Sequence, residues 1–244
     1  MQKVFRIKNK EGCTEAIIRS ALAYPHSLTN TDFIQNLTQS IPCLRSIGYA
    51  GFSQRKYLKE NLKYNITDEK NNTTPFEIPI DEILKTVKES VSLSSRHIKN
   101  QPIHIFLFPT FSQFVKKELD GVSGYTPFKN TLLLFLSPNK TKHWKRALIE
   151  TTCHEFMHAA MNNYHERKTL LDDLIFEGIS ESFVSSFFKP RKDTPSQALT
   201  EKEALRWHKK LIPRLQSTEL YYPVFLEGKD YPLWAGYSIG FHII

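Results

Sequence analysis

Two histidines and a glutamate lie within the stretch Thr152-Cys-His-Glu-Phe-Met-His158, which has the pattern H-E-x-x-H. His154 and His158 are four residues apart, so a helix places both imidazoles on one face, where they can bind a single metal ion. Glu155 lies about 100° further round such a helix and can reach a water on the metal without being a ligand. The pattern predicts a metal centre with a carboxylate placed to accept a proton.

A candidate third ligand follows on the next predicted helix. Glu177 comes after a gap of 18 residues, which leaves room to finish the first helix, turn and return antiparallel. Two histidines, a glutamate and a water form a recurrent catalytic zinc set. Glu181 lies one helical turn beyond Glu177 on the same face, where it can accept the spare N–H of a ligand histidine.

The segments around these residues have the composition of helices, which would hold the three candidate ligands in place. The segment 142–164 contains no proline or glycine and is apolar on much of its surface, so it predicts a buried helix whose histidines need partners. The segment 169–188 has apolar residues at helical spacing and predicts a second helix.

The rest of the chain predicts an α+β fold, mostly helical with a small sheet. Residues 102–108 and 130–136 are apolar runs of strand length. We expect residues 1–100 to form a helical N-terminal region and residues 101–244 to form the core that contains the metal centre, with both parts folded into one compact unit. Further helices are expected at 14–23, 31–40, 54–64, from 81 onward, and at 112–119, 200–212 and 232–244, with a loop at 71–75.

These motifs resemble those of a known class of proteases. H-E-x-x-H followed by a glutamate on the next helix is similar to the gluzincin metallopeptidases. The block Thr169-Leu-Leu-Asp-Asp-Leu-Ile-Phe-Glu-Gly-Ile-Ser-Glu181 and the block Trp234-Ala-Gly-Tyr-Ser-Ile-Gly240 resemble those of the DUF2268 family of predicted zinc-dependent proteases. The resemblance covers residues 130–244 and is weak over the first hundred residues.

The resemblance implies a zincin-like fold, in which a small sheet packs on the H-E-x-x-H helix and its edge strand borders the cleft. We expect the strand at 130–136 to provide this edge, where an extended peptide can pair through its backbone. The implied activity is hydrolysis of peptides or proteins with Zn²⁺ as cofactor and Glu155 as general base. Gluzincins commonly stabilise the oxyanion with a tyrosine or histidine C-terminal to the ligands. The options here are Tyr237, His242, Tyr231 and His208, and the glycines flanking Tyr237 favour it as the catalytic residue.

The segment upstream of the motif favours an endopeptidase. Aminopeptidases with the same gap carry a G-x-M-E-N block about thirty residues upstream, whose glutamate holds the substrate amine. Residues 121–149 of this chain contain no aspartate or glutamate. An ammonium entering a desolvated cleft needs an opposite charge, so a free N-terminus has no reason to be preferred.

Other classes of protein stay open. A zinc-binding sensor or scaffold that does not hydrolyse peptides would have a closed site, with Cys153 or Glu181 as a fourth ligand. Cys153 is more simply a buried packing residue. A different zinc hydrolase, or a module that binds charged surfaces, is a further alternative. His104, His143, His165 and His208 are expected to lie outside the metal centre.

Composition limits the partners and the compartment. The chain carries 33 basic and 25 acidic residues, a net charge of +8, with the basic residues scattered in ones and twos. This pattern favours weak binding to anionic surfaces over specific nucleic-acid binding. No apolar run approaches the length of a transmembrane segment or signal peptide. Three widely spaced cysteines, Cys13, Cys43 and Cys153, fit a reducing compartment, so we expect a cytoplasmic protein.

Overall fold

The computed structural model describes residues 3–8, 11–20, 22, 76–99, 102–128, 130–162 and 164–244. The chain divides into two compact units, residues 1–152 and 153–244. The helices predicted at 31–40 and 54–64, the loop at 71–75 and Cys43 lie outside the described residues. The boundary predicted near residue 100 stays a prediction.

The first unit is built on a mixed sheet, which in the described residues has five strands in the order β1-β2-β3-β5-β4. Strands β2, β3 and β5 run parallel, whereas β1 pairs antiparallel with β2 and β4 antiparallel with β5. The strands are β1 (Lys3–Lys8), β2 (Thr14–Ser20), β3 (Ile103–Pro109), β4 (Val122–Phe128) and β5 (Thr131–Leu136). The two runs predicted as strands are therefore confirmed as β3 and β5, and the α+β class holds.

Strands β3 and β5 lie inside the sheet because both of their faces are apolar. Every residue of β5 is buried, and most of β3 is buried as well. Continuous apolar runs are typical of parallel strands that are covered on both sides. The prediction that 130–136 forms an edge strand was wrong, since β5 lies between β3 and β4.

Strand β4 forms the edge beside β5 and had no predicted element. Its sequence contains Gly124 and Pro127, and its pairing with β5 becomes irregular between Tyr125 and Phe128. Proline lacks the N–H that an interior strand needs, so an edge position accommodates it. The two residues that disfavour a strand in the sequence thus fit the place that this strand occupies.

The helix predicted at 14–23 was wrong, because residues 14–20 form β2. Ala16, Ile18 and Ser20 are buried while their neighbours are only partly covered, which is the two-residue period of a strand. β1 precedes it, and Gly12 takes a positive φ of 84° in the turn between them. Pairing with β1 on one side and β3 on the other outweighs the helical reading of this short segment.

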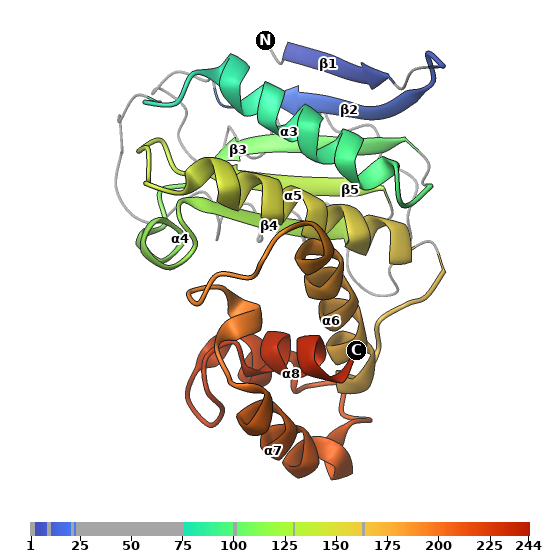
Figure 1. The fold of residues 1–244 in the computed structure, drawn as a ribbon, viewed down its shortest axis with the longest axis vertical. Helices are drawn as coiled ribbons and strands as arrows, with labels where there is room; N and C mark the ends of the chain where they lie inside the picture. The colour runs from blue at the N-terminus through green and yellow to red at the C-terminus, as the bar shows by residue number, and fades with distance from the viewer. Residues whose placement is uncertain are drawn as a thin grey trace. The chain divides into compact units, whose positions relative to one another are not determined.

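The helices of the first unit include α3 (Ile80–Ser95) and the short α4 (Gln113–Glu118), close to the predicted positions. α3 buries Ile83, Val87 and Val91, which recur every four residues along one face. Figure 1 draws α3 and the start of α5 in front of the sheet. α5 (Trp144–Met161) begins in this unit and ends in the second.

The second unit is helical in its described residues and contains α6 (Leu170–Phe187), α7 (Glu201–Leu211) and α8 (Ala235–Ile243). A π-helical segment, Pro223–Glu227, precedes α8. Leu174, Ala204, Phe225 and Ile239 are among the buried residues that join these elements in one apolar core. The four helices predicted from residue 142 onward are confirmed, with ends that differ by one to three residues.

The start of α8 is set by an unusual backbone conformation. Trp234, the residue before the helix, has φ 63°, a left-handed value that is rare for a bulky side chain. Such a conformation persists only where the surroundings enforce it.

Among the described residues, no helix is both long enough and apolar enough to cross a membrane.

Candidate metal centre

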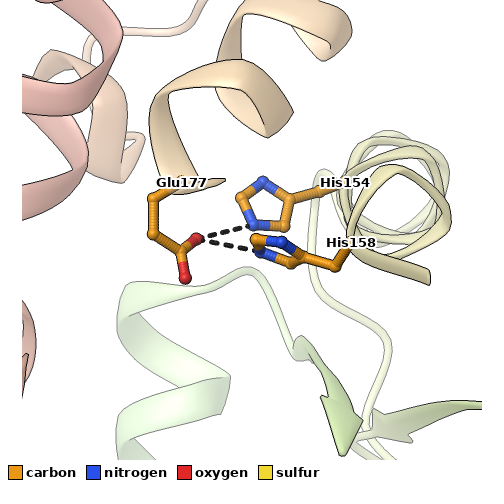
Figure 2. A group of neighbouring side chains, drawn as sticks. All are labelled: His154, His158 and Glu177. Atoms are coloured by element: carbon orange, nitrogen blue, oxygen red, sulfur yellow. Dashed lines mark hydrogen bonds and ion pairs between the residues drawn. The ribbon is translucent and has the colours of Figure 1, made fainter. Parts of the chain in front are cut away.

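The two histidines of the H-E-x-x-H pattern lie on one face of α5. The ring centroids of His154 and His158 are 4.6 Å apart and the rings are nearly perpendicular. Figure 2 shows both rings directed at the same carboxylate oxygen. The four-residue spacing therefore brings two imidazole nitrogens to one point, as the helix periodicity requires.

Glu177 supplies that oxygen from α6. Its Oε2 atom lies 3.1 Å from Nε2 of His154 and 3.0 Å from Nε2 of His158. Glu177 is 3% exposed, so its charge depends on these partners rather than on water.

The start of α6 fixes the register of this carboxylate. Thr169 is the N-cap, and its hydroxyl accepts a hydrogen bond from the Asp172 backbone N–H, while the Asp172 carboxylate accepts one from the Thr169 N–H. This reciprocal capping box satisfies two backbone donors that have no partner within the helix. Because the helix begins at Leu170, Glu177 lies two turns in, on the face toward the histidines.

Side chains on the same face of α6 also contact the second ring nitrogen, Nδ1, of each histidine. Glu181 Oε1 lies 3.1 Å from Nδ1 of His154, and Ser180 Oγ lies 3.3 Å from Nδ1 of His158. Partners on Nδ1 favour rings that carry the proton there and leave Nε2 as the ligand atom. Glu181 therefore lies where an outer partner of a metal-ligating histidine would lie. Ser180 was not predicted, although its place three residues after Glu177 put it on the same helix face.

Arg167 contacts the second oxygen of Glu177. Its Nη1 donates to Oε1 of Glu177 at 3.0 Å, and its Nε lies 3.4 Å from Oδ1 of Asp173. The guanidinium also lies 5.4 Å from the Tyr221 ring centroid and 5.7 Å from that of Phe176. Arg167 was not predicted either, because it precedes α6 in a loop and carries no motif signal.

The electrostatics of the group are strongly perturbed. Burial alone would lower the pKa of His154, but hydrogen bonds and charges from Glu177 and Glu181 outweigh it and raise the pKa well above its usual value. Burial alone would raise the pKa of Glu177, but the charge of His158 and the hydrogen bonds from both histidines hold it well below its usual value. Oppositely shifted groups packed together are typical of functional sites.

The donor atoms fit a zinc ion. One ligand atom each from His154, His158 and Glu177 lie within 4.8 Å of one another, and all three side chains are buried or nearly so. In a tetrahedral site with bonds of about 2.0–2.1 Å, neighbouring ligand atoms are about 3.3 Å apart. The two distances from a histidine Nε2 to Oε2 of Glu177, 3.1 and 3.0 Å, differ from this value by only a few tenths of an ångström. Among the described residues, this group includes neither Cys153, which is buried, nor Glu181.

Tyr237 is the candidate oxyanion donor that the structure brings to the histidines. Its ring centroid lies 6.4 Å from that of His154, and its hydroxyl shares a hydrogen bond with Tyr221. Burial raises the pKa of Tyr237 well above its usual value, and the charges of Glu177 and Glu155 add to this shift. Glu155 itself is buried. Tyr237 therefore keeps its proton at neutral pH.

The other candidates have different surroundings. Tyr231 accepts a hydrogen bond from Arg214 and packs on Trp207, on the α7 side of the unit. His208 lies on α7 and is partly exposed, while His242, near the end of α8, packs against the ring of Phe241.

His104, His165 and His143, which were predicted to lie outside the metal centre, are not among its three donors. His104 in β3 bonds through Nδ1 to Arg19 at 2.8 Å, and its pKa is lowered by burial and by the Arg19 charge. His165 pairs with Asp172 at 3.0 Å, and His143 is exposed.

Comparison with known proteins identifies the family. The family described as "Predicted Zn-dependent protease (DUF2268)" matches residues 83–244, which include both histidines, Glu177 and the final helix. No curated protein and no solved structure matches the chain. Because the match spans well over half of the sequence, the chain belongs to the DUF2268 family of predicted Zn-dependent proteases.

Proposed function

We propose that this protein is a zinc-dependent endopeptidase of the gluzincin type. The observation that carries the proposal is the convergence of His154 Nε2 and His158 Nε2 on Glu177 Oε2, with Glu155 next in sequence to a ligand histidine. The order of a sheet, the H-E-x-x-H helix and a helix that carries the third ligand supports a zincin-like assignment.

In this proposal His154, His158 and Glu177 hold the ion. Zinc, when bound there, acidifies a water and polarises the carbonyl of the peptide bond to be cut. Glu155 accepts a proton from the attacking water and passes it to the leaving amine. Glu181 and Ser180 keep the imidazoles oriented through their Nδ1 atoms.

Tyr237 is proposed to stabilise the oxyanion. Its hydroxyl is protonated at neutral pH because burial and nearby negative charge disfavour the phenolate. A neutral phenol can donate a hydrogen bond to an oxygen that becomes negative during the reaction. Tyr221, which shares a hydrogen bond with it, would fix the direction of that hydroxyl.

The number of ligands favours an enzyme over a sensor or scaffold. A structural zinc site is usually closed by four protein ligands, whereas a catalytic site keeps one position open. Among the described residues the group of donors contains three side chains. Glu181 contacts the histidine nitrogen on the far side from the convergence point, which argues against its being a fourth ligand.

The expected substrate is a peptide or protein cut within the chain. No carboxylate occurs from residue 121 to 149, the region in which related aminopeptidases carry the glutamate that holds a free amine. The three spaced cysteines support a reducing compartment such as the cytoplasm. A peptide and its N-acetylated twin should be cut at the same internal bonds, and release of single residues from the free peptide alone would overturn the endopeptidase assignment.

The Glu155→Gln variant tests the roles of these residues. It should keep the zinc and lose most hydrolysis, because it removes the proton acceptor and no ligand. His158→Ala should lose both. Zinc content and cleavage of a quenched-fluorescence peptide library would be measured on the same samples. Loss of zinc from Glu155→Gln would mean that Glu155 is a ligand and that the roles are wrongly assigned.

A further inference from the structure

Arg167 occupies the one oxygen of Glu177 that the histidines leave free. Figure 2 shows both histidine contacts converging on a single carboxylate oxygen, while the other points away. That other oxygen, Oε1, accepts a hydrogen bond from Nη1 of Arg167 at 3.0 Å. One oxygen of the carboxylate therefore faces the two histidines, and the other faces the guanidinium of Arg167.

We propose that Arg167 is a positioning residue that restricts Glu177 to binding the metal through one oxygen. This inference rests on the metal site of the proposed function. A carboxylate that turns both oxygens to a zinc ion would fill part of the coordination sphere that water and substrate need. A guanidinium on Oε1 opposes that rotation, because the turn would break a charge-assisted hydrogen bond in a buried place.

The surroundings of Arg167 hold it in this position. Asp173 lies 3.4 Å from its Nε, so two different carboxylates bind two different nitrogens of the guanidinium. The planar group lies against the rings of Phe176 and Tyr221 at 5.7 and 5.4 Å. Its side chain is 30% exposed and that of Glu177 is 4% exposed, so the contact is largely shielded from water. Four groups therefore fix the guanidinium, and arginine is suited to such a site because its donors form a rigid fork.

This role makes an unusual prediction about metal affinity. Removing Arg167 removes a positive charge from beside a metal ligand and leaves the carboxylates of Glu177 and Asp173 without it. The loss of this positive charge favours binding of a divalent cation next to the two carboxylates. A residue that only stabilised the fold would have the opposite effect, since its loss would weaken metal binding and stability together.

The test compares Arg167→Met, which loses the charge but keeps an apolar stem, with Arg167→Lys, which keeps the charge. Arg206→Met, on the exposed face of α7, is the control. Each protein is loaded with cobalt(II), whose visible absorption weakens as its coordination number rises, and zinc affinity is measured by competition with a chromogenic chelator. Steady-state cleavage of a peptide then gives kcat and KM separately.

Arg167→Met should bind zinc at least as tightly as the wild type. Its cobalt absorption should be weaker and shifted, and its kcat should be lower by about 10–100-fold with KM little changed. The cobalt spectrum of Arg167→Lys should stay close to that of the wild type, and Arg206→Met should match the wild type in all three measurements. An unchanged cobalt spectrum in Arg167→Met, or zinc affinity that falls together with thermal stability, would overturn the proposal.

Two further results have to be distinguished, namely a variant that does not fold and a wild type that binds metal without cutting peptides. If Arg167→Met does not fold, the double variant Arg167→Met/Asp173→Asn removes the carboxylate left without its partner and is measured in its place. If the wild type binds metal and cuts no peptide, the proposed function fails, whereas the cobalt spectra still decide the role of Arg167.

Discussion

Gly178 of α6 and Gly240 of α8 are in direct backbone contact. A Cβ atom on Gly178 would lie 2.3 Å from the carbonyl oxygen of Gly240, and one on Gly240 would lie 2.4 Å from that of Leu174. The glycine that follows Glu177 in E-G-x-x-E therefore permits the close crossing of α8. This crossing brings Tyr237 to the helix that carries Glu177.

We predict that Gly178→Ala destabilises the second unit. Alanine is the better helix former by about 1 kcal/mol, but the added methyl group overpacks the crossing, which typically costs about 1–3 kcal/mol. Urea unfolding followed by circular dichroism measures the net effect. Ser186→Ala, on an exposed position of α6, is the matched control and should be close to neutral. A Gly178→Ala protein more stable than the wild type would contradict this account of the crossing.

Glu181 should control the strength of metal binding. Its Oε1 atom lies 3.1 Å from Nδ1 of His154, so it orients the ring and raises the basicity of the opposite nitrogen. Glu181→Ala should weaken zinc affinity by about 10–100-fold, the usual effect of losing such a partner.

The matched control is Glu181→Gln, which keeps an oxygen acceptor and removes the charge, and which should lose less affinity than Glu181→Ala. Both constants come from competition with a chelator at one pH. If Glu181→Ala bound zinc as tightly as the wild type, the contact with His154 would have no part in holding the metal.

Two neighbouring aspartates should respond to pH in opposite ways. Burial would raise the pKa of Asp172, but hydrogen bonds from His165, Lys168 and Thr169 hold it below its usual range. Burial raises the pKa of Asp173 to about 6, with Arg167 opposing and Glu177 adding to the shift. Asp172 therefore contributes stability above its unfolded pKa, and that contribution is lost as the pH falls through its lower folded pKa. Ionisation of Asp173 instead costs stability as the pH rises from about 4 to 6.

Free energies of unfolding of the metal-free protein at about pH 4.5 and 7.5 test this contrast. The stability of Asp173→Asn relative to the wild type should rise between the two values, by up to about 2 kcal/mol. Asp172→Asn should be less stable than the wild type at both. If the stability of Asp173→Asn and that of the wild type depended equally on pH, the surroundings of Asp173 would not raise its pKa.

The parts of the site that could be predicted from the sequence are those governed by helix periodicity. His154 and His158 share a face because they are four residues apart, and Glu177 and Glu181 share a face for the same reason. The structure brings all four together. The apolar runs of β3 and β5 were also informative, because each is only six or seven residues long, which suits a buried strand better than a helix.

The parts that could not be predicted depend on contacts between distant segments. Arg167 reaches Glu177 from a loop, and Tyr221 reaches Tyr237 from before a π-helical turn, so neither has a periodic signal. The sequence of β2 also suits a short helix, and only its pairing with β1 and β3 decides in favour of a strand. The capping box of α6 did have a local signal, since Thr169 and Asp172 stand in the spacing that marks a helix start.

We propose that a single zinc ion held by His154, His158 and Glu177 supports hydrolysis of peptide bonds. The most direct measurement is a titration of zinc into the metal-free protein while cleavage of a peptide library is followed. Activity should be absent without metal, rise in proportion to added zinc and level off at about one equivalent, as expected for one three-ligand site. Zinc binding at one equivalent with no cleavage at any point of the titration would contradict the claim.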